Sequence, residues 1–208
     1  MKLFISIYKI FEERFTRNKA NFSPKYRPEI EGLKLHIGSG PINLEGWVNI
    51  DARAANHIHL NTNSVMLEEF SDHSIAEIYM CHVLEHFNIS EIESILKRYK
   101  QKLKIGGILR ISVPDFDLLI KIYEQTNKSI KLITPSILGG QDYEYNFHKI
   151  IFNRELLASI LEKVGFKNIE EWETMEVFGM TINDWSSKEI RNNLDHYKVS
   201  LNLCCKNI

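Results

Sequence analysis

The chain has 208 residues, of which 44% are hydrophobic and 25% are charged, and its formal net charge is −1. This length suits one domain with a substantial core, and the composition is typical of a soluble globular protein. The balanced charge argues against nucleic acid or an anionic membrane as the main partner. The three cysteines, Cys81, Cys204 and Cys205, have neither disulfide nor zinc-site spacing, which predicts reduced thiols and a cytoplasmic location.

The N-terminal residues 1–17 place apolar side chains at helical spacing between charged ones. This pattern predicts an amphipathic helix packed on the domain, and it leaves open a membrane-surface or homodimer contact. No apolar run approaches the ~20 residues that a membrane-spanning helix requires. Residues 18–31, with Pro24 and Pro28, are typical of a linker. The predicted organisation is therefore a helix and linker over 1–32 and one domain over 33–208.

From residue 33 onward, short apolar runs alternate with helical patterns, which predicts an α/β fold with helices on both faces of a mostly parallel sheet. Ser90 is the expected N-cap of the first of these helices, with Glu93 as its capping-box partner. Gly106 and Gly107 are expected to break the chain before the next strand. Strands are predicted over 34–37, 47–50, 58–60, 75–80, 108–113, 167–172 and 199–205, and helices over 90–103, 115–125 and 153–163.

The segment from Leu35 to Pro41 ends the first predicted strand with two glycines, Gly38 and Gly40, on either side of Ser39. Glycine at such a point lets the backbone turn tightly and approach a ligand closely. The second predicted strand ends at Asp51, where a carboxylate can accept hydrogen bonds from both hydroxyls of a ribose. The alternative for Asp51 is a carboxylate that caps its own loop.

A nicotinamide dinucleotide site is a less suitable interpretation of these glycines. That fingerprint requires a third glycine opening a helix whose N-terminus binds a pyrophosphate. Here Pro41 follows directly, and about ten residues complete the whole crossover. A long phosphate-binding helix does not fit in this length.

Five blocks of the sequence, in order, resemble the class I S-adenosylmethionine-dependent methyltransferases, in particular a bacterial branch with a short first crossover. The resemblance covers most of the chain from residue 33 onward. The blocks are LHIGSGPINLEGWVNID (35–51), FSDHSIAEIYMCHVLEHF (70–87), LKIGGILRISVPD (103–115), HKIIFNRELLASILEKVGF (148–166) and VSLNLCCK (199–206).

This resemblance implies a Rossmann-like, seven-stranded sheet whose last strand is antiparallel, with S-adenosylmethionine over the carboxyl ends of its strands. It places Gly38, Ser39 and Gly40 at the methionine part of the cofactor and Asp51 at the ribose. Asn61 is expected near the adenine, and His82 beside the cofactor cleft.

The sequence departs from the family at His36, where many members have an acidic residue, so the usual acidic contact to the methionine amino group is missing there. The segment His82 to His86 also matches H-x-x-E-H, the inverted zinc-protease motif. Those proteases need the motif within a longer helix and a third ligand downstream, whereas this segment follows a buried strand. The sequence therefore predicts no metal site.

Methyl transfer needs the nucleophile and the methyl group held close and aligned, and a base only for a hydroxyl or protonated amine acceptor. Residues 114–116 and 139–148 are expected to border the acceptor pocket. His148 is the first candidate for the base, with a structural role in its loop as the alternative. Asp115 can assist or cap the helix that follows it. Tyr143 and Tyr145 can stack on a sugar or ring, or simply pack.

The sequence thus predicts an S-adenosylmethionine-dependent methyltransferase with a small-molecule or glycan acceptor. Nucleic acid is not expected as the acceptor, because it would require several phosphate contacts from a chain with little net charge. The alternative is a binding or regulatory module that keeps the fold and the cofactor without the transfer chemistry.

Overall fold

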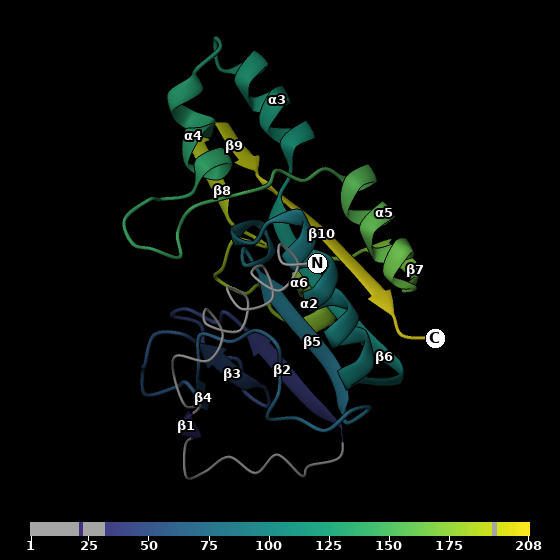
Figure 1. Cartoon of the computed structure of the whole chain (residues 1–208). Coiled ribbons are helices and arrows are strands. Elements are labelled where there is room, and N and C mark those ends of the chain that lie inside the picture. Colours follow the sequence, from purple (N-terminus) through teal and green to yellow (C-terminus); the bar gives the residue numbers. More distant parts are fainter. Residues whose placement is uncertain (1–20, 23–31, 193–194) are drawn as a thin grey trace, which may run out of the picture.

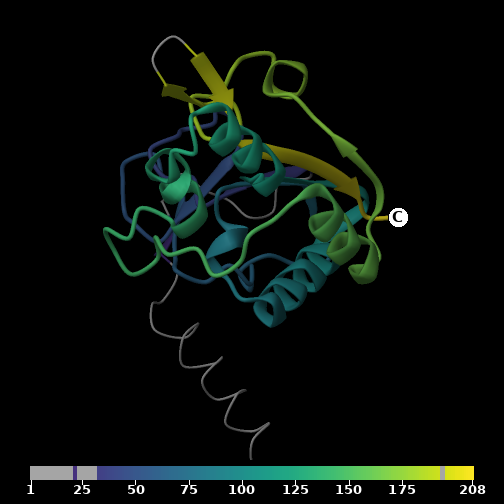
Figure 2. The same ribbon diagram turned by 90° about the horizontal axis from the view of Figure 1, so that it is seen from above.

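The computed structural model describes residues 21–22, 32–192 and 195–208. Its central feature is a twisted sheet with helices on both faces (Figures 1 and 2). In spatial order the strands are β1 (Asn21–Phe22), β4 (Leu60–Asn61), β3 (Val48–Asp51), β2 (Leu33–Ile37), β5 (Ile75–Cys81), β6 (Leu103–Pro114), β10 (Ser200–Lys206) and β7 (Lys167–Glu171).

The strands β4, β3, β2, β5 and β6 pair in parallel, whereas β10 pairs antiparallel with both β6 and β7. The prediction of a Rossmann-like, mostly parallel sheet with an antiparallel last strand is confirmed. Strand β1 adds a short antiparallel partner to β4 at the edge. The predicted helix over 1–17, with its membrane or dimer contact, lies outside the described residues, and of the predicted linker only Asn21 and Phe22 are described.

Alternating side chains of the central strands build two cores. On β5, Ile78 and Met80 join the larger core with α2 (Ile89–Lys102) and α5 (Arg154–Val164). Tyr79 points to the opposite face and packs there with Trp172 beside α6 (Thr174–Phe178). This alternation follows from the two-residue period of a strand, and it explains why helices cover both faces.

A third, smaller core lies beyond the carboxyl end of β6. It joins α3 (Phe116–Gln125), α4 (Ile130–Leu138) and the hairpin of β8 (Glu189–Asn192) and β9 (Asp195–Lys198). Figure 1 shows these elements together at one end of the sheet. Among the described residues, no helix is long and apolar enough to cross a bilayer.

Two local predictions were wrong. Helix α2 begins one residue after Asn88, whose side chain accepts the Glu91 amide while the Glu91 carboxylate accepts the Asn88 amide, so Ser90 and Glu93 are not its capping box. Gly106, at φ +78°, does not break the chain either. It lies within β6, close to an irregularity in the pairing with β5, so the strand already begins at Leu103.

Candidate functional site

A cavity of about 510 Å³ opens at the carboxyl ends of β2, β3 and β5. The chain runs from β2 to β3 and β4 on one side, then returns to β5 on the other side of β2. Ligands of open α/β sheets bind at such a reversal of strand order. The wall includes, among others, Gly38, Ser39, Gly40, Asp51, Thr62, Asn63, Ser64, His82, His86, Gly139, Asp142, Tyr143, Tyr145, His148, Asp184 and Trp185.

The glycine bend after β2 forms one wall of this cavity. Gly38 and Gly40 have φ values of +63° and +53°, a conformation that side chains other than glycine rarely adopt. A Cβ on Gly38 would also collide with the side chain of Val83. The amide of Ser39 is anchored on the carbonyl of Ile50 at 3.0 Å, which ties the bend to β3.

Asp51 lies at the end of β3, next to this bend. One carboxylate oxygen accepts the Gly40 amide at 2.8 Å, and the other accepts the Arg53 amide at 2.8 Å. A carboxylate offers about four acceptor positions, so further positions remain for a ligand. The structure therefore brings together the two features that the sequence places eleven residues apart.

Asn61 and His82, the other two predicted cofactor contacts, differ in position. The Asn61 side chain donates to the carbonyl of Asp51 at 3.0 Å, and Asn61 is not among the cavity-lining residues, although Thr62 and Asn63 are. His82 does line the cavity and has φ +52°. Its ring stacks on Trp185, with the ring centroids 5.6 Å apart.

His36 is buried at the base of the cavity. Its Nδ1 lies 3.1 Å from the Asn49 side-chain oxygen, and its ring stacks on Tyr79 with centroids 5.0 Å apart. Burial lowers the pKa of His36 to about 4, so the ring is neutral at neutral pH. His36 therefore brings no charge to the base of the cavity at neutral pH.

A buried carboxylate on the same cavity comes from a distant segment. Asp184 accepts a hydrogen bond of 2.6 Å from the Tyr79 hydroxyl and lines the cavity with Trp185. Burial, with smaller contributions from Cys81 and the Asp184 carboxylate, raises the pKa of Tyr79 well above its usual value, so the hydroxyl stays protonated as a donor. No sequence signal pointed to Asp184, because 105 residues separate it from Tyr79.

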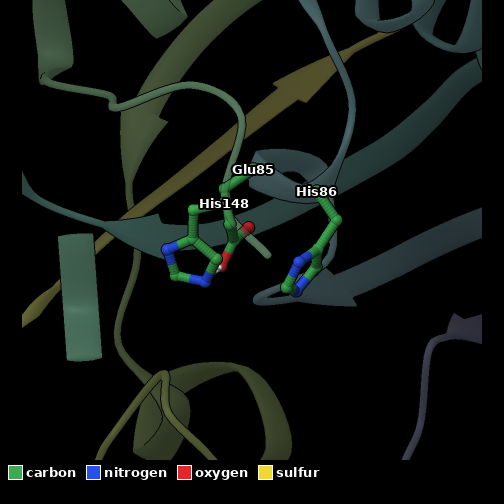
Figure 3. A group of neighbouring side chains, drawn as sticks. All are labelled: Glu85, His86 and His148. Atoms are coloured by element: carbon green, nitrogen blue, oxygen red, sulfur yellow. Dashed lines mark ion pairs between the residues drawn. The ribbon is translucent and has the colours of Figure 1, made fainter. Parts of the chain in front are cut away.

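Glu85, His86 and His148 meet at the wall of the cavity (Figure 3). Glu85 and His86 lie on the short 3-10 turn η1 (Leu84–His86), and His148 comes from the loop before α5. The amide of Lys149 donates to the Glu85 carbonyl at 2.8 Å, which holds this loop against η1. Burial raises the pKa of Glu85 to about 8, and burial, followed by the charge of His86, lowers that of His148 to about 4.

The loop before α5 forms the outer part of the cavity. Tyr143 and Tyr145 are half-exposed on this wall, and the Arg53 guanidinium lies 5.1 Å from the Tyr143 ring centroid. Residues 114–116 are not part of the wall. Asp115 instead caps α3 by accepting the Asp117 amide at 3.0 Å, the alternative expected for it.

Comparison with solved structures finds the same Rossmann-like fold in S-adenosylmethionine-dependent methyltransferases. A protein from Thermotoga maritima, described as a possible histamine N-methyltransferase, is 15% identical with a TM-score of 0.53, over 86% of this chain and 83% of that one. A methyltransferase from Archaeoglobus fulgidus is 16% identical with a TM-score of 0.52, over 99% and 93%.

The 1,6-didemethyltoxoflavin-N1-methyltransferase of Burkholderia thailandensis, solved with 1,6-didemethyltoxoflavin and S-adenosylhomocysteine bound, is 12% identical. Its TM-score is 0.53, over 85% of this chain and 71% of that one. At these identities the likeness shows the fold alone. No family model and no curated protein matches the sequence.

Proposed function

We propose that the protein is an S-adenosylmethionine-dependent methyltransferase acting on a small-molecule or glycan acceptor. The observation that carries this proposal is the contact between Asp51, at the tip of β3, and the glycine bend after β2, at the mouth of the cavity. The cavity volume of about 510 Å³ lies in the usual range for small-molecule and cofactor sites. The fold shared with solved methyltransferases supports the same function.

In this proposal the cofactor's methionine part lies over Gly38, Ser39 and Gly40, where no Cβ of Gly38 or Gly40 stands in the way. The ribose hydroxyls donate to the acceptor positions of Asp51 that its two backbone partners and the Arg53 guanidinium, 3.6 Å from Oδ1, leave open. Asn61 has a supporting part, since its side chain holds the end of β3 rather than the cavity wall.

The cofactor carries positive charge on its sulfonium and α-ammonium groups. It supplies to the reaction the methyl group on its sulfur. Two carboxylates, Asp51 and Asp184, line the cavity and complement this positive charge. We assign to Asp184 the acidic contribution that His36 cannot make.

The acceptor would lie toward the outer wall, between Tyr143 and Tyr145 on one side and His148 and His82 on the other. His148 donates through Nδ1 to the Ser136 carbonyl at 3.1 Å, so its Nε2 is the nitrogen that can accept a proton. In protein without a bound cation, we therefore assign to His148 the role of the base that accepts the proton of the acceptor group. Asp115 would act only through the start of α3. A cytoplasmic location agrees with the three free thiols.

Calorimetric titration with S-adenosylmethionine and S-adenosylhomocysteine tests cofactor binding directly. An assay for S-adenosylhomocysteine formation over pools of alcohols, amines and sugars then tests turnover. Binding with turnover on at least one pool supports the enzyme. Binding without turnover would favour the alternative, a non-catalytic module, and the absence of binding would contradict both.

A further inference from the structure

We propose that Glu85, His86 and His148 form a binding site for a divalent transition-metal ion of the Zn²⁺ type. Each residue offers one ligand atom, and these atoms all lie within 4.8 Å of one another. Figure 3 shows the three side chains converging from η1 and from the loop before α5. Two imidazoles and one carboxylate are a ligand set of catalytic zinc and related sites.

The Glu85 carboxyl group is isolated from hydrogen-bond donors. Its side chain is 1% exposed, and neither oxygen has a hydrogen-bond partner. A buried carboxylate in this condition is costly, because it has lost water without gaining a donor. A cation bound in the cluster toward which Glu85 points would give this carboxyl group the partner that it lacks.

The hydrogen bonds of two neighbouring histidines leave each with a lone pair near Glu85. The Ser200 hydroxyl donates to the Trp185 carbonyl at 2.7 Å, so it can only accept from His82 Nε2, which lies 2.8 Å away. The lone pair of neutral His82 is then on Nδ1. By the same logic the bond from His148 Nδ1 to the Ser136 carbonyl leaves a lone pair on His148 Nε2.

Both lone pairs face the same carboxylate oxygen. His82 Nδ1 lies 3.4 Å and His148 Nε2 3.8 Å from Glu85 Oε1. Charge-assisted hydrogen bonds from a protonated ring would close to about 2.7–2.9 Å, so these distances do not describe ion pairs in contact. The carboxyl oxygen thus lies near two imidazole nitrogens without a hydrogen bond to either, and an ion bound by Glu85 and His148 would give both of these residues a partner.

His86 has a backbone carbonyl near each ring nitrogen but can donate to only one of them. Its Nδ1 lies 3.2 Å from the Phe147 carbonyl and its Nε2 3.1 Å from the His82 carbonyl, yet a neutral ring has one N–H. One nitrogen can keep its carbonyl while the other binds the ion, as metal-binding histidines usually do. His148 has the same support from Ser136.

The geometry requires a modest contraction. Bonds of about 2.0–2.2 Å to a tetrahedral ion place ligand atoms about 3.3–3.6 Å apart. In the structure the three ligand atoms lie within 4.8 Å of one another, so the side chains would move slightly closer together on binding. His86 and His148 both line the cavity, so the open coordination position of the ion would face the acceptor. A role of the ion in catalysis rests on the proposed methyl transfer, whereas the metal site itself does not depend on that function.

The experiment titrates Zn²⁺ into chelator-treated full-length protein by calorimetry and records the visible spectrum after loading with Co²⁺. We expect one ion per chain and d–d bands without sulfur-to-metal charge transfer. Glu85→Gln and His148→Ala should each weaken Zn²⁺ binding more than about 100-fold, the upper range for loss of mere supporting contacts. His196→Ala is the matched control, because His196 pairs with Glu189 on the exposed hairpin and should leave the affinity unchanged.

His86→Ala serves as a further variant, with circular dichroism confirming that each variant is folded. Absence of Zn²⁺ binding, binding that survives Glu85→Gln and His148→Ala, or a thiolate spectrum would overturn the proposal. Titration of the same samples with S-adenosylmethionine separates the two questions. Protein that binds Zn²⁺ but not the cofactor would support the metal site and refute the proposed function. Protein that binds the cofactor but not Zn²⁺ would refute the metal site and leave the proposed function standing.

Discussion

At the scale of single residues, Asp51 has two tasks in the same place. It accepts two backbone amides that shape the cavity mouth, and it offers further acceptor positions to a ligand. A variant at this position therefore tests both the shape of the bend and the proposed ribose contact. The measurement must distinguish these effects from a simple loss of charge.

We expect Asp51→Ala to weaken S-adenosylmethionine binding by about 1–3 kcal/mol, or about 5- to 150-fold, because the ribose hydroxyls lose a buried acceptor. Calorimetry measures this directly. Asp195→Ala is the control, since Asp195 is an exposed carboxylate on β9 that does not line the cavity. An unchanged dissociation constant for Asp51→Ala would refute the ribose assignment.

Gly38 and Gly46 allow backbone strain to be separated from the shape of the cavity. Both have positive φ, +63° and +77°, but a Cβ on Gly46 meets nothing within 4 Å, whereas one on Gly38 meets Val83. Gly46→Ala should cost about 1–2 kcal/mol of unfolding free energy with unchanged cofactor affinity. Gly38→Ala should cost more in urea unfolding and also weaken the cofactor. Equal effects of the two variants on affinity would contradict the role of the bend.

The sequence predicted the proximity of cavity residues that end neighbouring strands, but it did not predict the contacts between distant loops. The glycine bend and Asp51 end adjacent parallel strands, so their proximity follows from the fold. Asp184 and the pairing of Glu85 with His148 depend on loops that carry no periodic pattern. The H-x-x-E-H string contains Glu85 and His86, but the sequence predicted no metal site there, and the proximity of His148 became apparent only in three dimensions.

At the scale of elements, the start of α2 shows how closely spaced polar residues mislead a capping prediction. Asn88, Ser90, Glu91 and Glu93 offer two overlapping capping boxes. The structure uses Asn88 with Glu91, and the Ser90 hydroxyl donates to the Asn88 side chain instead. The two choices differ by two residues, within the range where helix ends are hard to locate.

Asn88→Ala should therefore lower the free energy of unfolding by about 1 kcal/mol, because the Glu91 amide loses its acceptor. Ser90→Ala should change it by less than about 0.5 kcal/mol, as for an ordinary surface position. Urea denaturation of the two variants beside the parent protein measures both. A larger loss for Ser90→Ala than for Asn88→Ala would reverse the assignment of the cap.

Apolar runs and helical periodicity predicted most strands and three of the helices. The missed elements have physical reasons. Helix α4 contains Pro135, which is unusual inside a helix, and α6 has only five residues. The β8–β9 hairpin is mostly exposed, so it lacks the alternation of a half-buried strand.

At the scale of the whole molecule, the buried His36 makes stability depend on pH. Its pKa is about 4 in the folded protein, against 6.5 as the ordinary value. Because the folded pKa is lowered, the unfolded chain binds more protons between these two values, and stability falls as pH decreases through that window. The groups that set this pKa or face the ring are Asn49, Tyr79, Asp184, Asp51 and His57.

The contribution of His36 amounts to at most about 3 kcal/mol. The free energy of unfolding should fall between about pH 7 and about pH 5 in the parent protein, and His36→Gln should flatten this slope. Guanidinium denaturation at the two pH values measures the difference. His196→Gln, at an exposed histidine, should keep the parental slope. An identical slope for His36→Gln would show that the ring is already protonated in the folded protein.

The position of β10 between β6 and β7 has a consequence for synthesis on the ribosome. In the described sheet β7 pairs with β10 alone, although β7 is made earlier. The nascent chain must therefore hold β7 and the unpaired flank of β6 without their shared neighbour until β10 has emerged. Unpaired strand flanks of this kind attract other chains. The interval between the synthesis of β7 and the insertion of β10 is thus the stage at which a chaperone would protect this protein most.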